Sequence, residues 1–181
     1  MSSLDTGIKN VRNVQKYTIG SGSIAELPTL LEPRRSMTGS PVLFFIDQYF
    51  EDKTKILASL GHQDDDRLIF VTTQNEPTTD YIDELVRSLK DSQIADPAAI
   101  VGMGGGAAMD IGKAVANLLT NGGLAKDYQG WDLVSVPGVY KIAIPTLSGT
   151  GAEATRTCVM TNKQTGLKLG MNSDFTVYDQ I

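Results

Sequence analysis

The sequence predicts an α/β fold: a Rossmann-like parallel sheet with helices on both faces and a short β extension. Three observations predict it. Short apolar runs alternate with amphipathic stretches, the stretches have helical spacing, and glycine or proline marks several of the boundaries. Alternating strands and helices favour right-handed crossovers and a parallel sheet. Ligands of such sheets bind at the carboxyl ends of the strands, so the residues that follow each strand are the candidates for function.

Five apolar runs are expected to be the strands of this sheet. The run 42–46, which ends in Asp47, is continuously apolar, and this is typical of a strand buried on both faces. Two later runs predict the β extension. In chain order, the seven expected strands are residues 14–19, 42–46, 68–71, 99–103, 141–145, 155–160 and 167–171.

The stretches between the strands carry helix signals. A helix is expected after Asp47, another from Pro77 and a third after Gly106, and glycines stand where two of them should end. Between the first two strands, an apolar segment over 24–31 is followed by a loop from Pro33 to Ser40. The residues expected on the buried helix faces are Phe50, Leu57, Leu60; Ile82, Leu85, Val86, Leu89; and Ile111, Ala114, Val115, Leu118, Leu119.

Composition excludes several classes of protein. The 181 residues favour one domain, and 41% hydrophobic residues are enough for a core. Sixteen Lys and Arg against 21 Asp and Glu give a net charge of −5, which argues against sequence-independent nucleic-acid binding. No apolar run approaches the ~20 residues that a membrane-spanning helix needs.

Single cysteine and histidine residues limit the chemistry further. Cys158, expected to be a buried thiol, cannot form an internal disulfide and suits a reducing, cytoplasmic location. His62 is the only histidine, so this chain cannot supply a multi-histidine metal site, and we expect it on the surface beside the acidic run 64–66, interpreted as a solvated turn. No residue is assigned a catalytic or metal-binding role.

The strongest candidate site is the triple glycine 104–106, which opens the helix that contains Asp110. Backbone N–H groups and the positive end of the dipole at a helix N-terminus bind phosphate, and glycines allow close approach. The alternative is a tight strand-to-helix turn that needs glycine only for steric reasons. Asp110, near the first helical turn, is also explained structurally by the helix dipole.

Three other segments lie where strands end. Asp47 could accept hydrogen bonds from both hydroxyls of a ribose and would repel a 2′-phosphate, or it could cap the helix that follows. The loop with Glu76 precedes a helix that starts with proline, which explains much of it. Segment 144–153, which includes Thr146 and Thr150, offers N–H and O–H donors; a flexible loop is the alternative.

Two of these segments together resemble the iron-containing (group III) alcohol dehydrogenase family. Segment 104–113 resembles its Gly-Gly-Gly-Ser-x-x-Asp-x-Ala-Lys motif, and segment 144–153 resembles Ile-Pro-Thr-Thr-x-Gly-Thr-Gly-Ser-Glu. Asp47, the Glu76 loop and residues 166–168 follow in family order, so the resemblance extends over residues 14–181. Ala107, Gly112 and Leu147 are departures from the motifs.

The resemblance implies roles for individual residues. Gly104, Gly105 and Gly106 would hold the pyrophosphate of a dinucleotide, NAD or NADP, and Asp47, which favours NAD, would hold the adenosine ribose. Thr146 and Thr150 would lie along the cofactor, in a site that also includes Glu76. Lys168 would lie near the nicotinamide ribose and Asp110 near the nicotinamide end.

The resemblance also implies what lies outside this chain. Residues 1–181 would be the N-terminal nucleotide-binding domain, and a C-terminal helical domain with an iron or zinc ion would follow. The complete enzyme would oxidise a small alcohol and form a homodimer, whereas this chain alone would be inactive. Residues 128–132 and 171–175 are similar to the branch that acts on the terminal hydroxyl of 3-deoxy-octulosonate, a sugar acid.

Two other functions remain open on the sequence alone. The chain could be a non-catalytic module for nucleotide binding or dimerisation. It could also belong to a sugar-phosphate cyclase of the dehydroquinate-synthase type, which shares the architecture; a site for a substrate phosphate would favour that alternative.

Overall fold

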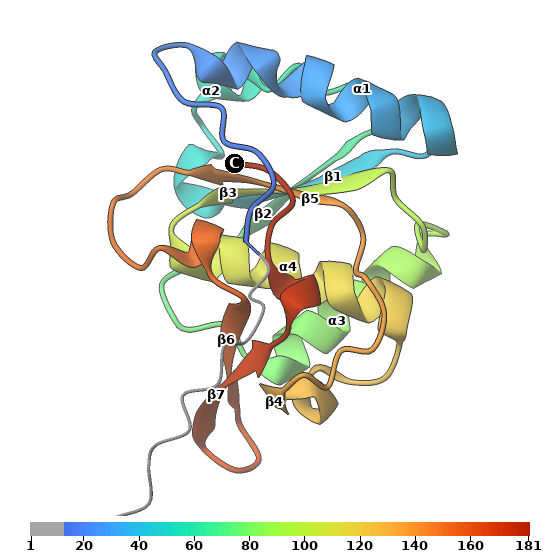
Figure 1. The fold of residues 1–181 in the computed structure, drawn as a ribbon, viewed down its shortest axis with the longest axis vertical. Helices are drawn as coiled ribbons and strands as arrows, with labels where there is room; N and C mark the ends of the chain where they lie inside the picture. The colour runs from blue at the N-terminus through green and yellow to red at the C-terminus, as the bar shows by residue number, and fades with distance from the viewer. Residues whose placement is uncertain (1–12) are drawn as a thin grey trace, which may run out of the picture.

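A computed structural model describes residues 13–181; the first twelve residues of the predicted 1–181 domain lie outside the description. Its centre is a four-stranded, fully parallel sheet in the order β2-β1-β3-β5. The helices pack in layers on its two faces (Figure 1). The prediction of a Rossmann-like α/β fold is therefore confirmed. The strands are β1 (Val42–Asp47), β2 (Arg67–Val71), β3 (Ala99–Gly104) and β5 (Lys141–Pro145).

Each face of the sheet has its own apolar core. One core joins α1 (Leu27–Thr38) and α2 (Thr54–Ser59) to the side chains of Val42, Phe44 and Ile46. The other joins α3 (Thr79–Asp91) and α4 (Gly106–Asn121) to the alternate residues of β1. Because alternate residues of a strand point to opposite faces, a continuously apolar β1 is what two covered faces require.

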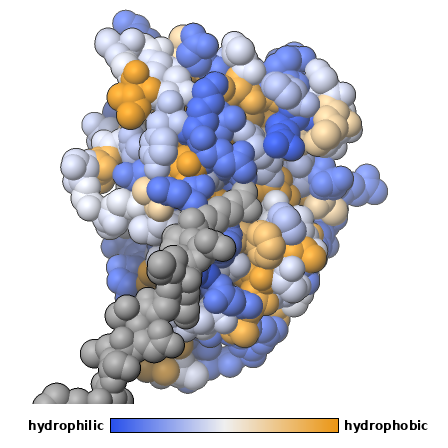
Figure 2. Space-filling view, in the orientation of Figure 1, coloured by the Kyte–Doolittle hydropathy of each residue, from blue (hydrophilic) through white to orange (hydrophobic). Residues whose placement is uncertain are grey.

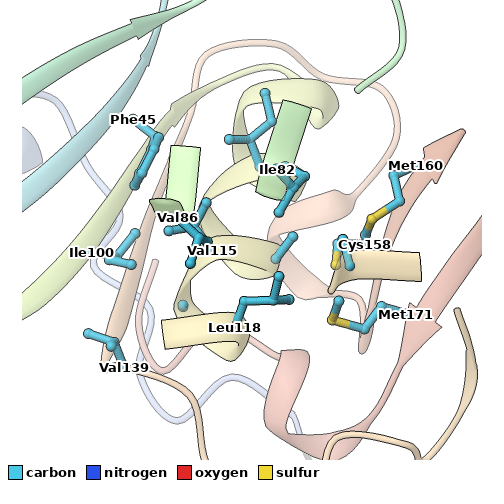
Figure 3. Close-up of a cluster of buried hydrophobic side chains, with 14 of the residues drawn as sticks. Phe45, Ile82, Val86, Ile100, Val115, Leu118, Val139, Cys158, Met160 and Met171 are labelled. Carbon is cyan, nitrogen blue, oxygen red and sulfur yellow. The ribbon is translucent and has the colours of Figure 1, made fainter. Parts of the chain in front are cut away.

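A second, three-stranded sheet in the order β4-β7-β6 is the expected β extension. It consists of β4 (Gly130–Trp131), β6 (Thr157–Asn162) and β7 (Leu167–Asn172). Its residues Cys158, Met160 and Met171 belong to the same core as Val115 and Leu118 of α4, so α4 lies between the two sheets (Figure 3). This explains why α4 is buried almost all round, from Ala108 to Leu118.

Three sequence-based expectations for the first 60 residues are wrong. Residues 14–19 form an extended segment with one bridge, Lys16 to Gln180, because they pair only with the three residues 179–181. The loop expected from Pro33 to Ser40 is the second half of α1, which ends at Thr38. The helix after Asp47 is split into a 3₁₀ turn, Gln48–Phe50, and the six-residue α2.

Contacts beyond the helix explain why α1 continues past Pro33. The Arg34 guanidinium lies 3.9 Å from the ring centroid of Tyr140. Arg35 donates two hydrogen bonds to Asp66, at 2.7 and 2.5 Å. These partners are distant in sequence, and they hold the last turn of the helix although proline removes one internal hydrogen bond.

Asp66 is buried, so the interpretation of residues 64–66 as a solvated turn is wrong for this residue. Its carboxylate also accepts hydrogen bonds from the backbone N–H groups of Val42 and Gln63. Burial by itself raises the pKa of Asp66, but the Arg35 guanidinium and the two N–H groups outweigh it and hold the pKa below its ordinary value. Asp66 thus ties α1 to the start of β1.

Within residues 13–181, none of the helices is long and apolar enough to cross a membrane. On the face shown in Figure 2, apolar side chains lie in small groups between polar ones. Scattered groups of this kind are ordinary for a protein surface.

We predict that Asp66→Asn lowers the free energy of unfolding by about 3 kcal/mol, because it leaves the Arg35 guanidinium without its counter-charge. Asp65→Asn, at an exposed neighbour, is the control. Chemical denaturation measures both. Because the pKa of Asp66 is lowered on folding, the wild type should lose this contribution only as pH falls below 3.8. Equal stability of the two variants at pH 7 would contradict the assignment.

Candidate functional site

The candidate site begins where three parallel strands end together. In the register of the sheet, Ile46 is opposite Met103, and Gly104 is opposite Pro145. Asp47, the glycine turn 104–106 and the loop after Pro145 therefore meet at one edge. A hydrogen bond of 3.0 Å from the Thr146 N–H to the Gly104 carbonyl connects the loop after β5 to the glycine turn.

The glycine turn leads directly into the N-terminus of α4. Gly104 has φ 149°, and a Cβ there would lie 2.8–2.9 Å from the Cβ atoms of Ala108 and Asp47, so only glycine fits. Gly105 and Gly106 are half-exposed. A Cβ on Gly106 would lie 2.7 Å from Thr150 Oγ1. The first N–H groups of an α-helix lack intrahelical acceptors, so these half-exposed residues offer donors to an anion.

Asp47 caps the 3₁₀ turn that follows β1. One carboxylate oxygen accepts a hydrogen bond from the Tyr49 N–H at 3.0 Å, and the other accepts one from Thr73 Oγ1 at 2.9 Å. The capping interpretation is therefore what the structure shows. Each oxygen can accept a second hydrogen bond, so the predicted ribose contact is compatible with this geometry.

A cavity of about 210 Å³ opens beside the first turn of α4. It brings Gly106, Thr150, Asp110, Glu76 and Lys168 together, although they come from separate segments of the chain. Lys168 and Glu76 form a half-exposed ion pair of 2.7 Å across it. Five of the nine predicted site residues thus line one cavity, whereas Asp47, Gly104, Gly105 and Thr146 lie outside its wall along the strand ends.

Asp110 is the residue of this cavity whose pKa is most strongly shifted. One of its carboxylate oxygens accepts a hydrogen bond from the Val159 N–H at 3.0 Å. The other, Oδ1, is buried and has no hydrogen-bond partner among residues 13–181. Burial raises the pKa of Asp110 to about 6, although Lys113 and the Val159 N–H act in the opposite direction. A buried acceptor without a donor is costly, so it suggests a place for a ligand.

Some residues of the site were not predicted from the sequence. Thr155 and Thr157 line the cavity, and Thr73 holds Asp47. Thr73 follows a predicted strand, and Thr155 and Thr157 lie within another, so their only local signal is this position. Lys113 belongs to the recognised motif, but its position among the apolar residues of α4 was not assigned a role; it is buried.

One departure from the family motif has a packing explanation. Gly112 occupies the alanine position of the motif, and a Cβ there would lie 3.0 Å from Tyr178 Oη. Tyr178 is buried, and its hydroxyl donates a 2.7 Å hydrogen bond to the Met109 carbonyl. The space left by Gly112 and Gly102 is therefore used by this phenol.

Other parts of the chain are less suited to chemistry. A larger cavity of about 310 Å³, between α1 and β5, is lined mainly by aliphatic residues and by no acidic or basic side chain. His62 is exposed, and Cys158 is buried, with its thiol pKa raised by that burial, as the sequence predicted for both positions. Residues 13–181 contain no group of three or more His, Cys, Asp or Glu side chains that could hold a metal ion.

This chain is similar in sequence to known dehydrogenases and reductases. Residues 14–180 match the family described as iron-containing alcohol dehydrogenase. The chain is 34% identical over 113 residues to sulfoacetaldehyde reductase of Bilophila wadsworthia, covering 62% of this chain and 28% of that protein. It is 30% identical over 154 residues to NAD-dependent methanol dehydrogenase of Bacillus methanolicus, covering 83% and 39%.

A solved structure extends this likeness to the fold. Alcohol dehydrogenase from Oenococcus oeni superposes with a TM-score of 0.79 and 26% identity over 96% of this chain and 45% of that one. The chain spans less than half the length of each of these three proteins.

We predict that Asp110→Asn stabilises the ligand-free protein at pH 8 by about 1–3 kcal/mol and has no such effect at pH 4. The folded state binds the Asp110 proton more tightly than the unfolded state does, so stability falls as pH rises from 3.8 to about 6. Unfolding at both pH values measures this. The control, Asp91→Asn at the exposed end of α3, should show no such pH dependence. An unchanged stability of the Asp110 variant at pH 8 would contradict the prediction.

Proposed function

Because this chain belongs to the iron-containing alcohol dehydrogenase family, we propose that it is the dinucleotide-binding part of an NAD-dependent alcohol oxidoreductase. The observation that carries the proposal is the half-exposed glycine turn at the N-terminus of α4, beside a cavity that contains an unpaired carboxylate oxygen. We assign residues 1–181 to its nucleotide-binding domain.

The glycine turn suits the pyrophosphate of the cofactor. The N–H groups of Gly105, Gly106 and Ala107 are the donors, and the helix dipole of α4 favours the negative charge. Gly104 lies behind them, buried against Asp47 and Ala108, so its part is to allow the turn. Leu147 and Thr150 lie beside the glycines on the loop after β5, where Thr146 and Thr150 would follow the cofactor.

Asp47 would bind the adenosine ribose and select the cofactor. Its carboxylate is fixed by Tyr49 and Thr73, and it has acceptor capacity for the ribose hydroxyls. A 2′-phosphate at the same place would face this negative charge. We therefore assign NAD rather than NADP as the cofactor.

The cavity at Asp110 would take the nicotinamide end. With about 210 Å³ it is too small for a whole dinucleotide, so it suits one terminal group. The unpaired Asp110 Oδ1 is an acceptor for the N–H₂ of a carboxamide, and Lys168, at the mouth with Glu76, is a donor for ribose oxygens. Bound NAD supplies the hydride acceptor; the residues of this chain bind and orient it.

Residues 13–181 do not provide the ligands that a catalytic metal needs. The iron implied by the family name would need a ligand set that residues 13–181 lack. The complete oxidoreductase would act on a small alcohol with residues from outside this chain, and this chain alone would bind NAD without turnover. The expected homodimer stays a prediction.

A sugar acid as substrate is the narrower form of the proposal. The segments 128–132 and 171–175, on which it rests, do not line the cavity at Asp110. It therefore stays a prediction from the sequence. Substrate-dependent reduction of NAD by this chain alone would contradict the proposal that it binds NAD without turnover.

Titration of NADH with the purified chain, followed by nicotinamide fluorescence, tests the proposed function. We expect saturable binding that EDTA leaves unchanged, because no metal site is needed for it. A protein that shows no saturable binding of either NADH or NADPH would contradict the proposal.

We predict that Asp47→Ser raises the affinity for NADPH relative to NADH by about tenfold, which corresponds to about 1.4 kcal/mol. The reason is the lost repulsion between the carboxylate and the 2′-phosphate. Asp52→Ser, which removes an exposed carboxylate from the same loop, is the matched control and should leave the ratio unchanged. Parallel titrations with both cofactors give the ratio; an equal change in the two variants would count against the role of Asp47.

A further inference from the structure

Lys113 is a buried cation whose charge is directed at one short segment of the chain. Its side chain comes from α4 and has no exposed surface. Four oxygen atoms surround the ammonium at 2.5–3.1 Å: the carbonyls of Ala152, Thr155 and Thr157, and Thr155 Oγ1. A buried ammonium needs such acceptors, because losing them leaves its charge without compensation.

These acceptors lie at the end of the loop that runs from β5 past the glycine turn. Three carbonyls within six residues accept hydrogen bonds from one ammonium, so the chain turns around Lys113 as it enters β6. In Figure 1 this segment, just before β6, lies against the first half of α4. β6 starts at Thr157, two residues later than the sequence predicted.

A chain of contacts connects this anchor to the proposed cofactor site. The Ala152 carbonyl accepts from Lys113, and the Ala152 N–H donates to Thr150 Oγ1 at 3.2 Å. The Thr150 hydroxyl packs against Gly106, because a Cβ at residue 106 would lie only 2.7 Å from it. Residues 145–150, which begin at the end of β5, are exposed. The loop is restrained at its other end, where residues 152–157 bind Lys113.

We propose that Lys113 is a positioning residue, which holds residues 150–157 in the conformation that lines the dinucleotide site. It does not contact the cofactor. Its effect on affinity rests on the proposed function, whereas its effect on the loop does not. The restraint lowers the cost of binding, because a loop already in place loses little conformational freedom when the cofactor binds.

Lys141 provides a matched control, because it is a second buried lysine of this fold. It lies at the other end of β5, paired with Asp179 at 3.9 Å. Replacing either lysine by methionine removes a buried cation and keeps the length of the side chain. Both variants should be less stable than the wild type, so stability alone does not distinguish a positioning role from a merely structural one.

Hydrogen exchange and NADH titration of the 181-residue chain distinguish the two roles. In Lys113→Met, we expect amide exchange in residues 150–157 at least tenfold faster than in Lys141→Met, and NADH affinity about tenfold weaker. Lys113→Arg keeps a cation with donors and should recover part of both losses. If Lys113→Met and Lys141→Met agree in loop exchange, or if the loop loosens while NADH affinity is unchanged, the proposal is wrong.

Thr155→Val keeps the test decisive if Lys113→Met does not fold. It removes one of the four acceptors without removing the charge, and we expect a smaller increase in exchange confined to the same residues. Unchanged exchange there would overturn the proposal. A wild-type chain that binds no NADH would instead contradict the proposed function, while the exchange data would still decide whether Lys113 restrains the loop.

Discussion

The parallel register of β1, β3 and β5 is the constraint on which the rest of the site depends. It brings Asp47, Gly104 and Pro145 to one edge, and the next residues of the chain must leave the sheet there. Only glycine fits at residue 104, between the side chains of Asp47 and Ala108. This close packing sets the direction of α4, and α4 in turn places Asp110 in the cavity and Lys113 under the loop.

Much of this arrangement was predictable because its signals are local. Apolar runs identified the four strands of the sheet, helical spacing identified α3 and α4, and glycines marked the turn before α4. The prediction that functional residues follow the strands also needs only the rule for parallel sheets. Gly106 and Thr150 meet at one cavity because they follow the neighbouring strands β3 and β5, whereas Lys168 reaches the same cavity from β7 of the second sheet.

The remaining features depend on partners distant in sequence. Nothing near Asp66 indicates that Arg35 will pair with it, so an acidic run resembles a solvated turn. The same holds for α1 beyond Pro33 and for Tyr178, which fills the space left by Gly102 and Gly112. In these cases contacts with residues distant in sequence override the local preference of the chain, and only the folded structure shows them.

The most direct test of the proposed pyrophosphate site is a titration of the isotope-labelled chain with NAD, followed residue by residue through its backbone amide resonances. We expect saturable shifts of Gly105, Gly106 and Ala107, larger than those elsewhere, because their N–H groups would bind the pyrophosphate. Shifts confined to the aliphatic cavity between α1 and β5, with the glycine turn unaffected, would show that the helix N-terminus is not the binding site.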